Sequence, residues 1–416
     1  MNFRLLAWKS LSSRRSTAIL TVTSIAVSVM LLLGVEKIRF NAQSSFANTI
    51  SGTDLIVGAR SGSIQLLLYS VFRIGNATNN ISWESYQDIA QKKGVKWTIP
   101  ISLGDSHRGF RVMGTNKDYF SFYQYGQKRN LQLTSGKPFS DIFDAVIGSE
   151  VAKSLHYSVG DEIIISHGTV STPFSEHKDK PFIISGIFKQ TGTPVDKTVH
   201  VSLEGIEAMH FNWQGLVKKR KVGKILSKAN LKPESITAFL IGLDSKIMSF
   251  KLQRYINEDI PEPLLAIFPG IALHELWSLI SVAEQALLII TIFVVIASLA
   301  GMLAVSLAGL NERRREVAIL RSVGASHWHI MGLLITETLL LTVAGILLGI
   351  AVLYSAIKLG QPIIEAKYGL FIPISIPNER EFAMASILLL TGFVVGLIPA
   401  YQAYRNSLAD GMSTRL

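Results

Sequence analysis

The histidine and glutamate of the stretch HELWS (274–278) are the residues whose spacing comes nearest to known chemistry. On a helix, the pattern H-E-x-x-H binds zinc through two imidazoles one turn apart. Here Ser278 occupies the position of the second imidazole, and the chain has no cysteine that could supply a thiolate instead. The neighbouring histidines do not pair at ligand spacing. The sequence therefore predicts no metal site.

The stretches SGKPF (135–139) and VGKIL (222–226) each contain the Gly-Lys pair that is part of the phosphate-binding P-loop pattern. A P-loop needs an upstream glycine and a Ser or Thr directly after the lysine, because these groups cradle the phosphates and hold magnesium. Both stretches lack them, and no G-x-S-x-G stretch marks a serine nucleophile. We therefore predict that the chain is not an enzyme and carries no cofactor. If ATP and magnesium drive it, a partner must bind them.

Glu337 is the one ionisable residue inside any long apolar run of the chain. A carboxyl group inside a membrane is a functional candidate, because burying its charge is costly. One hypothesis is a proton relay. The other, which we favour, is a structural or coupling contact, because Glu337 lies near the cytoplasmic end of its run, where it can pair with an interfacial arginine.

Four apolar runs are long enough to cross a membrane, in a chain that is 48% hydrophobic and 17% charged. They lie between Arg15 and Glu36, between Glu284 and Glu312, from about 330 to 357, and between Glu381 and Arg405. The first run ends without a small-x-small cleavage site, so it indicates an uncleaved signal anchor. The predicted fold class is an α-helical membrane protein with four transmembrane helices, one N-terminal and three C-terminal, and a large mixed α/β extracytoplasmic domain.

Lysine and arginine near the ends of the spans set the predicted orientation, because cytoplasmic flanks carry an excess of both. The N-terminal segment, the 311–329 loop and the C-terminal tail are basic, so all three are predicted to be cytoplasmic. With a bacterial source assumed, this describes a multi-pass protein of the inner (cytoplasmic) membrane. The predicted segments are 1–16 (cytoplasmic), 17–36 (first span), 51–270 (periplasmic domain), 274–309 (stalk and second span), 311–326 (cytoplasmic helix), 329–355 (third span), 356–381 (periplasmic loop), 382–404 (fourth span) and 405–416 (tail).

The first two membrane helices are predicted to be longer than the membrane is thick. The helical pattern continues from 17 to about 50 in the first and from about 274 to 309 in the second. At 1.5 Å per residue each helix would be ~50 Å long, against ~30 Å of hydrocarbon. We therefore expect both helices to extend outward as a stalk for the periplasmic domain.

The periplasmic domain is predicted to be mixed α/β. Short runs rich in β-branched residues, such as DLIVGA, FRVMGT, DAVIG, EIIIS, FIISGIF and TVHVSL, alternate with helical pieces. Two subdomains are expected, one of about 51–135 with 230–268 and one of 140–215. The apolar stretch SIQLLLYSVF (63–72) would suit lipid handling if exposed, and would be uninformative if buried. The basic run KKRKVGK (218–224) is predicted to be a solvated loop or a lipid-facing patch, with no nucleic acid as partner.

Small residues recur four apart on the predicted spans, where they let helix backbones approach closely in lipid. Generic bundle packing accounts for them, and nothing in the spans indicates a polar pore. The glycines of this kind are Gly301, Gly345, Gly349, Gly392 and Gly396.

The connector NERRREVAILRSVGAS (311–326) is a charged stretch between two apolar runs. Arg313, Arg314 and Arg315 suit the headgroup boundary. Val317, Leu320 and Val323, with Ile319 beside them, form an apolar face at helical spacing. Gly324 suits a left-handed C-cap, and Ser326 can cap the next helix. The connector is either an ordinary interfacial helix or a docking helix for a cytoplasmic motor.

The connector and the span after it resemble the signature of the MacB/FtsX/LolC-type ABC transporter permeases. The stretch EVAILRSVGAS precedes a span that opens with the acid Glu337 and continues with Gly345-x-x-x-Gly349. Ala318 stands where the family usually has glycine. The four-span layout and the stretches DAVIGSEVAKSLHYSVGDEIII and FIISGIFKQTGTPVD extend the resemblance over nearly the whole chain. The coupling residues that it implies are Glu316, Val317, Ile319, Leu320, Arg321, Val323, Gly324 and Ala325.

The resemblance implies a permease that dimerises, as a homodimer or with a paralogue, and binds two copies of a separate ABC ATPase through 312–325. ATP-driven closure of the ATPases would swing the stalks and do work outside the membrane (mechanotransmission). The chain has no fused nucleotide-binding domain. In this respect it resembles LolC or LolE more than MacB. Further partners implied are membrane lipids and a periplasmic adaptor, carrier or lipoprotein.

Two functions remain open at this point. The main hypothesis is a transport permease for a lipoprotein, an amphiphile or a peptide. The alternative is an FtsX-like regulator, in which the same stalk motion activates an envelope hydrolase or sensor.

Overall fold

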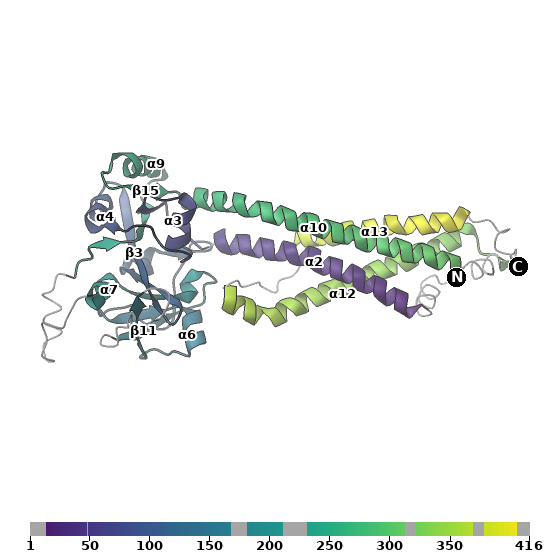
Figure 1. The fold of residues 1–416 in the computed structure, drawn as a ribbon, viewed down its shortest axis with the longest axis horizontal. Helices are drawn as coiled ribbons and strands as arrows, with labels where there is room; N and C mark the ends of the chain where they lie inside the picture. Colours follow the sequence, from purple (N-terminus) through teal and green to yellow (C-terminus); the bar gives the residue numbers. More distant parts are fainter. Residues whose placement is uncertain are drawn as a thin grey trace. The chain divides into compact units, whose positions relative to one another are not determined.

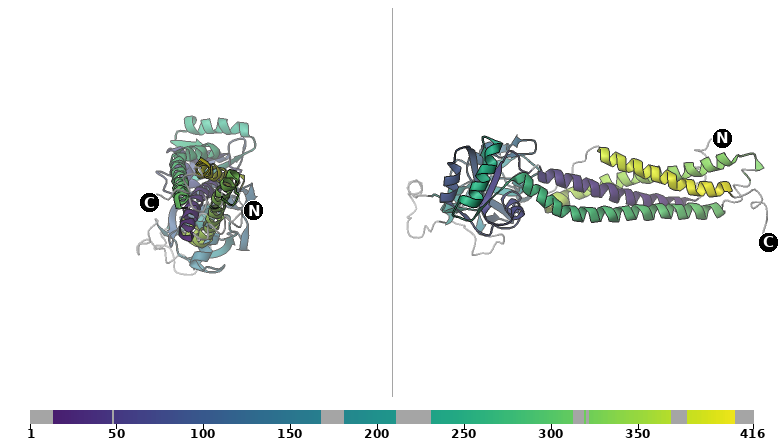
Figure 2. Two further views of the ribbon diagram at one scale, coloured as in Figure 1. Left: turned by 90° about the vertical axis from the view of Figure 1, so that its right-hand side faces the viewer. Right: turned by 90° about the horizontal axis from the view of Figure 1, so that it is seen from above.

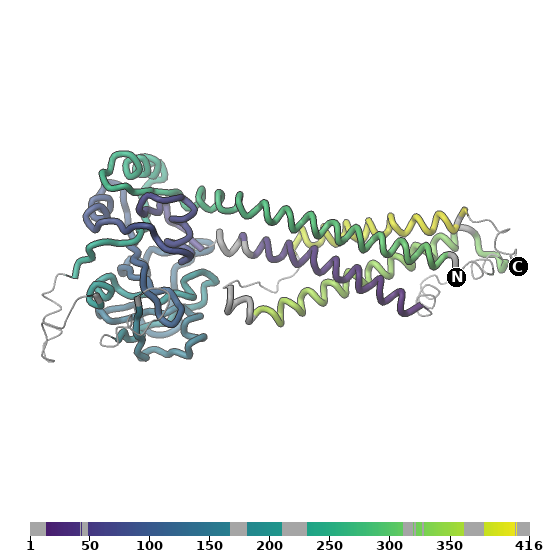
Figure 3. The backbone as a smooth tube through the Cα atoms, in the orientation of Figure 1, coloured from purple at the N-terminus to yellow at the C-terminus, as the bar shows by residue number. Residues whose placement is uncertain are grey.

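The structure is a computed structural model that describes residues 14–47, 49–167, 181–210, 231–312, 319, 322–368 and 378–405 (Figure 3). The chain divides into two units. The helical unit comprises residues up to 41, 281–363 and 372 onward, and the α/β unit comprises 42–280 and 364–371. The division falls inside helices α2 (Arg15–Ala47) and α10 (Pro269–Glu312), so each of these helices runs without a break from one unit into the other.

Four long helices build the helical unit: α2, α10, α12 (His327–Tyr368) and α13 (Glu379–Arg405) (Figure 1). Each contains a segment that is long and apolar enough to cross a membrane. Large apolar side chains such as Leu20, Phe293 and Leu390 are 62–66% exposed on them. A bundle that is apolar on its outside is suited to lipid as its solvent. The predicted arrangement of one N-terminal and three C-terminal membrane helices is confirmed.

The ends of these helices differ from the predicted ends. The helix α10 begins at Pro269 rather than 274, because proline lacks only an N–H that the first turn of a helix does not use. The helix α12 continues to Tyr368, so the first half of the predicted 356–381 loop is helical. Loss of hydropathy marks where a span leaves the membrane, whereas the end of a helix is set by capping and chain-breaking residues.

One mixed sheet organises the α/β unit, with further strands pairing onto it. Its path is β15 (Leu264–Ile267), β1 (Leu55–Ala59), β14 (Ala238–Leu243), β3 (Val95–His107), β4 (Phe110–Thr115), β12 (Thr198–Ser202), β8 (Asp144–Ile147), β11 (Phe182–Phe188) and β7 (Leu133–Gly136). Off this path, β9 (Glu162–Ile163) pairs with β11 and β10 (Ser166–His167) pairs with β3. The pairs β4–β12 and β8–β11 are parallel, and the others are antiparallel.

The long strand β3 changes the predicted subdivision of this unit. Its first part pairs with β14 and its last part with β4, and the register shifts between Leu103 and Ser106. Strand β3 therefore belongs to both halves of one continuous sheet. Strands β4 and β7 pair with β12 and β11, so they belong with the 140–215 block and not, as predicted, with 51–135. The prediction grouped strands that are close in the sequence, whereas strand pairing joins segments that are far apart in the chain.

Alternating side chains divide the core between the two faces of the sheet. In β1, Ile56 packs in a cluster on one face, while Leu55 and Val57 pack in a cluster on the other. The face of Ile56 is covered by helix α3 (Ser63–Ser70), by α5 (Asp118–Phe122) and by the start of α10. The opposite face carries α4 (Trp83–Ala90), α6 (Ser149–Leu155), α7 (Leu203–His210) and α9 (Lys246–Arg254). Figure 2 gives two further views of this arrangement.

Short elements complete the unit. They are the paired strands β2 (Ile81–Ser82) and β13 (Ser235–Ile236), the paired strands β5 (Gln124–Tyr125) and β6 (Arg129–Asn130), the 3-10 helix η1 (Pro194–Lys197) and the π-helical turn η3 (Tyr255–Asp259).

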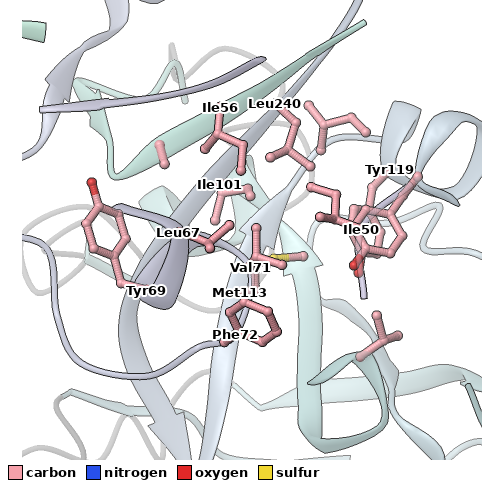
Figure 4. Packing of buried hydrophobic residues seen from close by; sticks show 14 of the residues in the cluster. Ile50, Ile56, Leu67, Tyr69, Val71, Phe72, Ile101, Met113, Tyr119 and Leu240 are labelled. Atoms are coloured by element: carbon pink, nitrogen blue, oxygen red, sulfur yellow. The ribbon is translucent and has the colours of Figure 1, made fainter. Parts of the chain in front are cut away.

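The stretch SIQLLLYSVF forms helix α3 and the residues just after it, and it is a core element. Leu66 and Leu67 are fully buried, and Tyr69, Val71 and Phe72 are nearly so (Figure 4). A side chain at Gly58 of β1 would collide with Leu66 and Tyr69, so the glycine lets α3 lie close to the sheet. Because the stretch is buried, it does not distinguish lipid handling from the alternative function.

Candidate functional site

The connector between α10 and α12 is described only in part. Glu316, Val317, Leu320, Arg321 and the three arginines at 313–315 lie outside the described residues. Their roles in docking and at the membrane interface therefore stay predictions.

The described part of the connector exposes apolar side chains. Ile319 and Val323 are 62% and 83% exposed. They are one helical turn apart, and the Val323 amide donates a 3.1 Å hydrogen bond to the Ile319 carbonyl oxygen. Gly324 comes next with φ of +96°, a left-handed conformation that favours glycine, and Ala325 is half-buried. The connector thus presents two apolar side chains that are largely exposed.

Ser326 directly precedes α12 and contacts His329 in its first turn, and its role as the cap stays a prediction. Its carbonyl oxygen accepts a 3.0 Å hydrogen bond from the His329 amide. Its amide donates a 3.2 Å hydrogen bond to Nδ1 of the His329 ring, and its hydroxyl pairs with the same nitrogen.

Glu337 lines a small cavity of about 180 Å³ inside the helical unit. Arg14, which directly precedes α2, Thr21 of α2 and Ser306 of α10 line the same cavity. The guanidinium of Arg14 also donates a hydrogen bond of 3.3 Å to the carbonyl oxygen of Gly309 in α10. Whether Glu337 is a structural or coupling contact or part of a proton relay stays a prediction.

Four of the five predicted packing glycines lie at helix–helix contacts. A Cβ atom at Gly345 would meet Ile25 of α2, and one at Gly349 would lie 2.7 Å from the carbonyl oxygen of Ala26. In α13, Cβ atoms at Gly392 and Gly396 would collide with Thr342 and Thr338 of α12. A Cβ at Gly301 meets no atom within 4 Å, so the described residues give that glycine no packing role.

Gly349 and Gly301 form a matched pair for a test of this packing. Gly349→Ala is expected to destabilise the solubilised protein by about 1–3 kcal/mol, because α2 and α12 must move apart. Gly301→Ala is expected to have no destabilising effect, since the methyl group meets open space and alanine favours helix. The measurement is the thermal unfolding midpoint in detergent. Equal midpoints for the two variants would contradict the packing role of Gly349.

A cluster of charged residues with a buried centre joins all four helices, and the sequence analysis did not predict it. Lys37 of α2 lies 3.6 Å from the Glu381 carboxylate of α13, and both side chains are nearly completely buried. The Lys37 ammonium also donates a 3.1 Å hydrogen bond to the hydroxyl of Tyr354 in α12 and lies over its ring. We name the whole set the charge cluster, and its members are Glu36, Lys37, Arg39, Glu284, Tyr354, Arg380 and Glu381.

The remaining members of the charge cluster surround the buried carboxylate of Glu36. Arg39 lies 3.1 Å from it and Arg380 lies 3.7 Å from it, measured between guanidinium nitrogen and carboxylate oxygen. Arg39 also reaches Glu284 of α10 at 3.9 Å. Oppositely charged residues at the ends of three apolar runs were the available signal. Such residues also mark the boundary of a span, so the sequence alone does not show that they meet.

The described residues contain no group of three or more histidine, aspartate and glutamate side chains placed to hold a metal ion.

Comparisons with known proteins identify both parts of the chain. The family model of the FtsX-like permease C-terminal domain matches residues 288–408. The model of the MacB-like periplasmic core domain matches residues 18–230, which is more than half of the chain. No curated protein matches the sequence.

Two solved structures are similar to part of the chain. The periplasmic region of MacB from Actinobacillus actinomycetemcomitans is 9% identical, over 55% of this chain and 94% of that chain, with a TM-score of 0.35. The extracellular domain of the noncanonic ABC-type transporter YknZ from Gram-positive bacteria is 13% identical, over 52% of this chain and 99% of that chain, with a TM-score of 0.30.

The two family matches lie where the sequence resemblance placed them, with the MacB-like domain before the last three membrane helices and the FtsX-like domain over them. The resemblance is therefore confirmed, and the protein is a multi-pass membrane protein. The chain belongs to the MacB/FtsX-type ABC transporter permeases.

Proposed function

We propose that the protein is the permease subunit through which a separate cytoplasmic ATPase does mechanical work outside the bacterial inner membrane. The partner would bind ATP and magnesium, and this chain would be neither an enzyme nor a cofactor carrier. The observation that carries the proposal is the exposed apolar pair Ile319 and Val323 on the connector. Exposed apolar side chains beside a membrane span, in a family whose permeases work with an ATPase, suit a protein dock.

The continuity of α2 and α10 supports the transmission step. These helices have 33 and 44 residues, which gives lengths of about 50 and 66 Å at 1.5 Å per residue. Each runs without a break through both units. Because a hydrogen-bonded helix is stiff along its axis, a shift at one end is passed to the other.

The charge cluster supports the same step. It links α2 to α10, α12 and α13 through ion pairs and a hydrogen bond, and the side chains of Glu36, Lys37 and Glu381 among them are buried. Buried ion pairs tolerate little change in geometry, because each charge depends on its partner for solvation. We therefore propose that the four helices move as one body when the ATPases close.

Isolation of the complex is the first test. The full chain would be purified from its native membranes in a gentle detergent, and co-purifying proteins would be identified by mass spectrometry. We expect a stoichiometric P-loop ATPase, together with a lipoprotein, an adaptor or a second permease. An ATPase accompanied by a cell-wall hydrolase would favour the regulator function. If no ATPase co-purifies, the connector is an ordinary interfacial helix and the docking proposal is wrong.

Substitutions in the connector test the dock directly. Leu320→Asp and Arg321→Glu are expected to reduce ATPase co-purification and to abolish ATP-dependent work, because they place negative charge in the proposed interface. Arg321→Lys, which keeps the positive charge, is the matched control. It should retain most of the ATPase co-purification and most of the ATP-dependent work. If the acidic variants bind and stimulate the ATPase as the unsubstituted protein does, the connector is not the dock.

A further inference from the structure

Arg73, which follows helix α3, carries a buried positive charge with which no described carboxylate forms an ion pair. Its Nη2 donates a 2.6 Å hydrogen bond to Sδ of Met113, whereas its Nε and Nη1 are buried without a hydrogen-bond partner among the described residues. Burial lowers the pKa of Arg73, and the hydroxyls of Tyr119 and Tyr123 oppose this only in part. An unpaired buried charge is costly, because the protein interior solvates it poorly. The packing around Arg73 therefore holds its guanidinium in the core against an electrostatic cost.

The backbone at Arg73 is strained as well. Its φ is +61°, in the left-handed region that suits glycine and is unfavourable for a residue with a Cβ atom. The turn is joined to α3 by a 3.0 Å hydrogen bond from the Ile74 amide to the Leu68 carbonyl oxygen, and the Ile74 side chain is already 54% exposed. We name residues 71–74 the α3 end. It lies at the surface, and it carries both the strained backbone and the unpaired charge.

His200 of β12 is a titratable group that faces this guanidinium. Burial, and secondly repulsion by Arg73, lower the pKa of His200 to about 3. Its Nδ1 lies 3.2 Å from the Val146 carbonyl oxygen, so Nδ1 carries the proton of the neutral ring. Its Nε2, which would take up a second proton, is buried without a partner among the described residues. Protonation of His200 would therefore place a second unpaired positive charge beside the first.

The other ionisable groups around His200 do not offset that charge. Tyr119 stacks on the His200 ring, with centroids 5.1 Å apart. Burial raises the pKa of Tyr119 well above 10 and that of Tyr123 to about 12, so both stay neutral in acid. The carboxylate of Asp196, which interacts with Tyr119, accepts hydrogen bonds of 2.7–3.0 Å from the amides of residues 191–192. Burial raises the pKa of Asp196, so acid removes its negative charge early.

We propose that protonation of His200 releases the α3 end from the core of the α/β unit. Repulsion between the two buried cations is relieved when Arg73 turns out into water, because Arg73 lies in a strained surface turn whereas His200 lies inside a strand. Its neighbours Val71 and Phe72, which are 3% and 7% exposed, then leave the core with it. Acid would thus expose the apolar end of the stretch SIQLLLYSVF. This inference does not depend on the proposed function.

Hydrogen exchange of the full chain in lipid nanodiscs tests the proposal. The reporters are the amides of Val71, Phe72 and Ile74, which donate hydrogen bonds to carbonyl oxygens of α3, and they are compared with the amides of β14 in the sheet. We expect lower protection factors at the α3 end than in β14, because the opening is local. The protection factors of the α3 end should also fall roughly 50-fold between pH 6.5 and 4.5, because His200 takes up a proton only in the open form.

Three variants show which groups cause the fall. His200→Phe keeps the ring and cannot take up a proton, so the protection of the α3 end should no longer fall in acid. His107→Gln is the matched control, because His107 is a second buried histidine whose pKa is lowered, but its ring contacts Ile164 and Tyr157. The fall should persist in His107→Gln. Arg73→Met removes the unpaired charge and should raise the protection of the α3 end about 3–10-fold at pH 6.5.

Four results would overturn the proposal. The first is equal protection of the α3 end and β14 at every pH, since the opening is then global. The second is a local opening of the α3 end that does not depend on pH. The third is a fall in protection that persists in His200→Phe, and the fourth is lower protection in Arg73→Met than in the unsubstituted protein.

Discussion

Replacing Lys37 with methionine is expected to destabilise the helical unit by about 3–5 kcal/mol. The substitution leaves the carboxylate of Glu381 buried without the ammonium that lies 3.6 Å away. An uncompensated buried charge is far more costly than the loss of one attraction, because the protein interior solvates it poorly. Pairing Lys37→Met with Glu381→Leu should restore most of the lost stability, since both charges are then gone. The measurement is the thermal unfolding midpoint of the full chain in detergent.

An exposed ion pair provides the control for this experiment. Lys92 lies 3.3 Å from Asp88 in the α/β unit, with side chains that are 38% and 54% exposed. Lys92→Met removes the same kind of contact where water solvates both groups, so the midpoint should barely move. If Lys37→Met proves as mild as Lys92→Met, the charge cluster does not hold the four helices together.

The second large effect concerns His200, whose neutral form the α/β unit requires. The side chain is completely buried, between the rings of Tyr119 and Phe188. Burial, and secondly repulsion by the Arg73 guanidinium, lower its pKa from 6.5 to about 3. Between these two values the unfolded chain binds a proton that the folded chain does not bind. The free energy of unfolding should therefore rise with pH across that window, by about 1.4 kcal/mol per pH unit.

We expect the stability of this unit to fall as the pH is lowered from 6.5 to 4.5, and His200→Phe to flatten that dependence. Phenylalanine keeps the ring packing and cannot take up a proton. The measurement is the urea midpoint at each pH, read in the full chain from hydrogen exchange of the β12 amides. Burial also shifts the pKa of His107 downward and that of Asp196 upward. His107 and Asp196 are present in both the unsubstituted protein and His200→Phe. The difference between their two curves of urea midpoint against pH therefore reports on His200 alone. Parallel curves would mean that His200 does not couple folding to pH.

The parts of the fold that depend on local composition could be predicted from the sequence. A helix of about 20 apolar residues matches the thickness of the hydrocarbon core of a membrane. The four spans could therefore be inferred from length and hydropathy alone. The predicted strands rich in β-branched residues, such as FIISGIF and the TVHVS of TVHVSL, form β11 and β12, because such side chains suit a buried pleated sheet. The packing of Gly345 and Gly349 could be inferred for the same kind of reason, because small residues four apart lie on one side of a helix.

Only the tertiary structure decided which distant segments meet. The pairing of β4 with β12 joins residues about 90 apart in the chain, and no local pattern specifies it. The burial of Lys37 is of the same kind, since an amphipathic lysine at the end of a span normally reaches water. It is buried because α12 and α13 supply Tyr354 and Glu381 around it. A cavity of about 630 Å³, lined by Trp83 and Tyr86 of α4 and by Leu203 of α7, likewise exists only because two separate helices cover one face of the sheet. Composition and periodicity determined which segments form helices and strands and which of them lie in lipid. The charge cluster and the cavity depend on contacts between elements, which only three-dimensional packing decides.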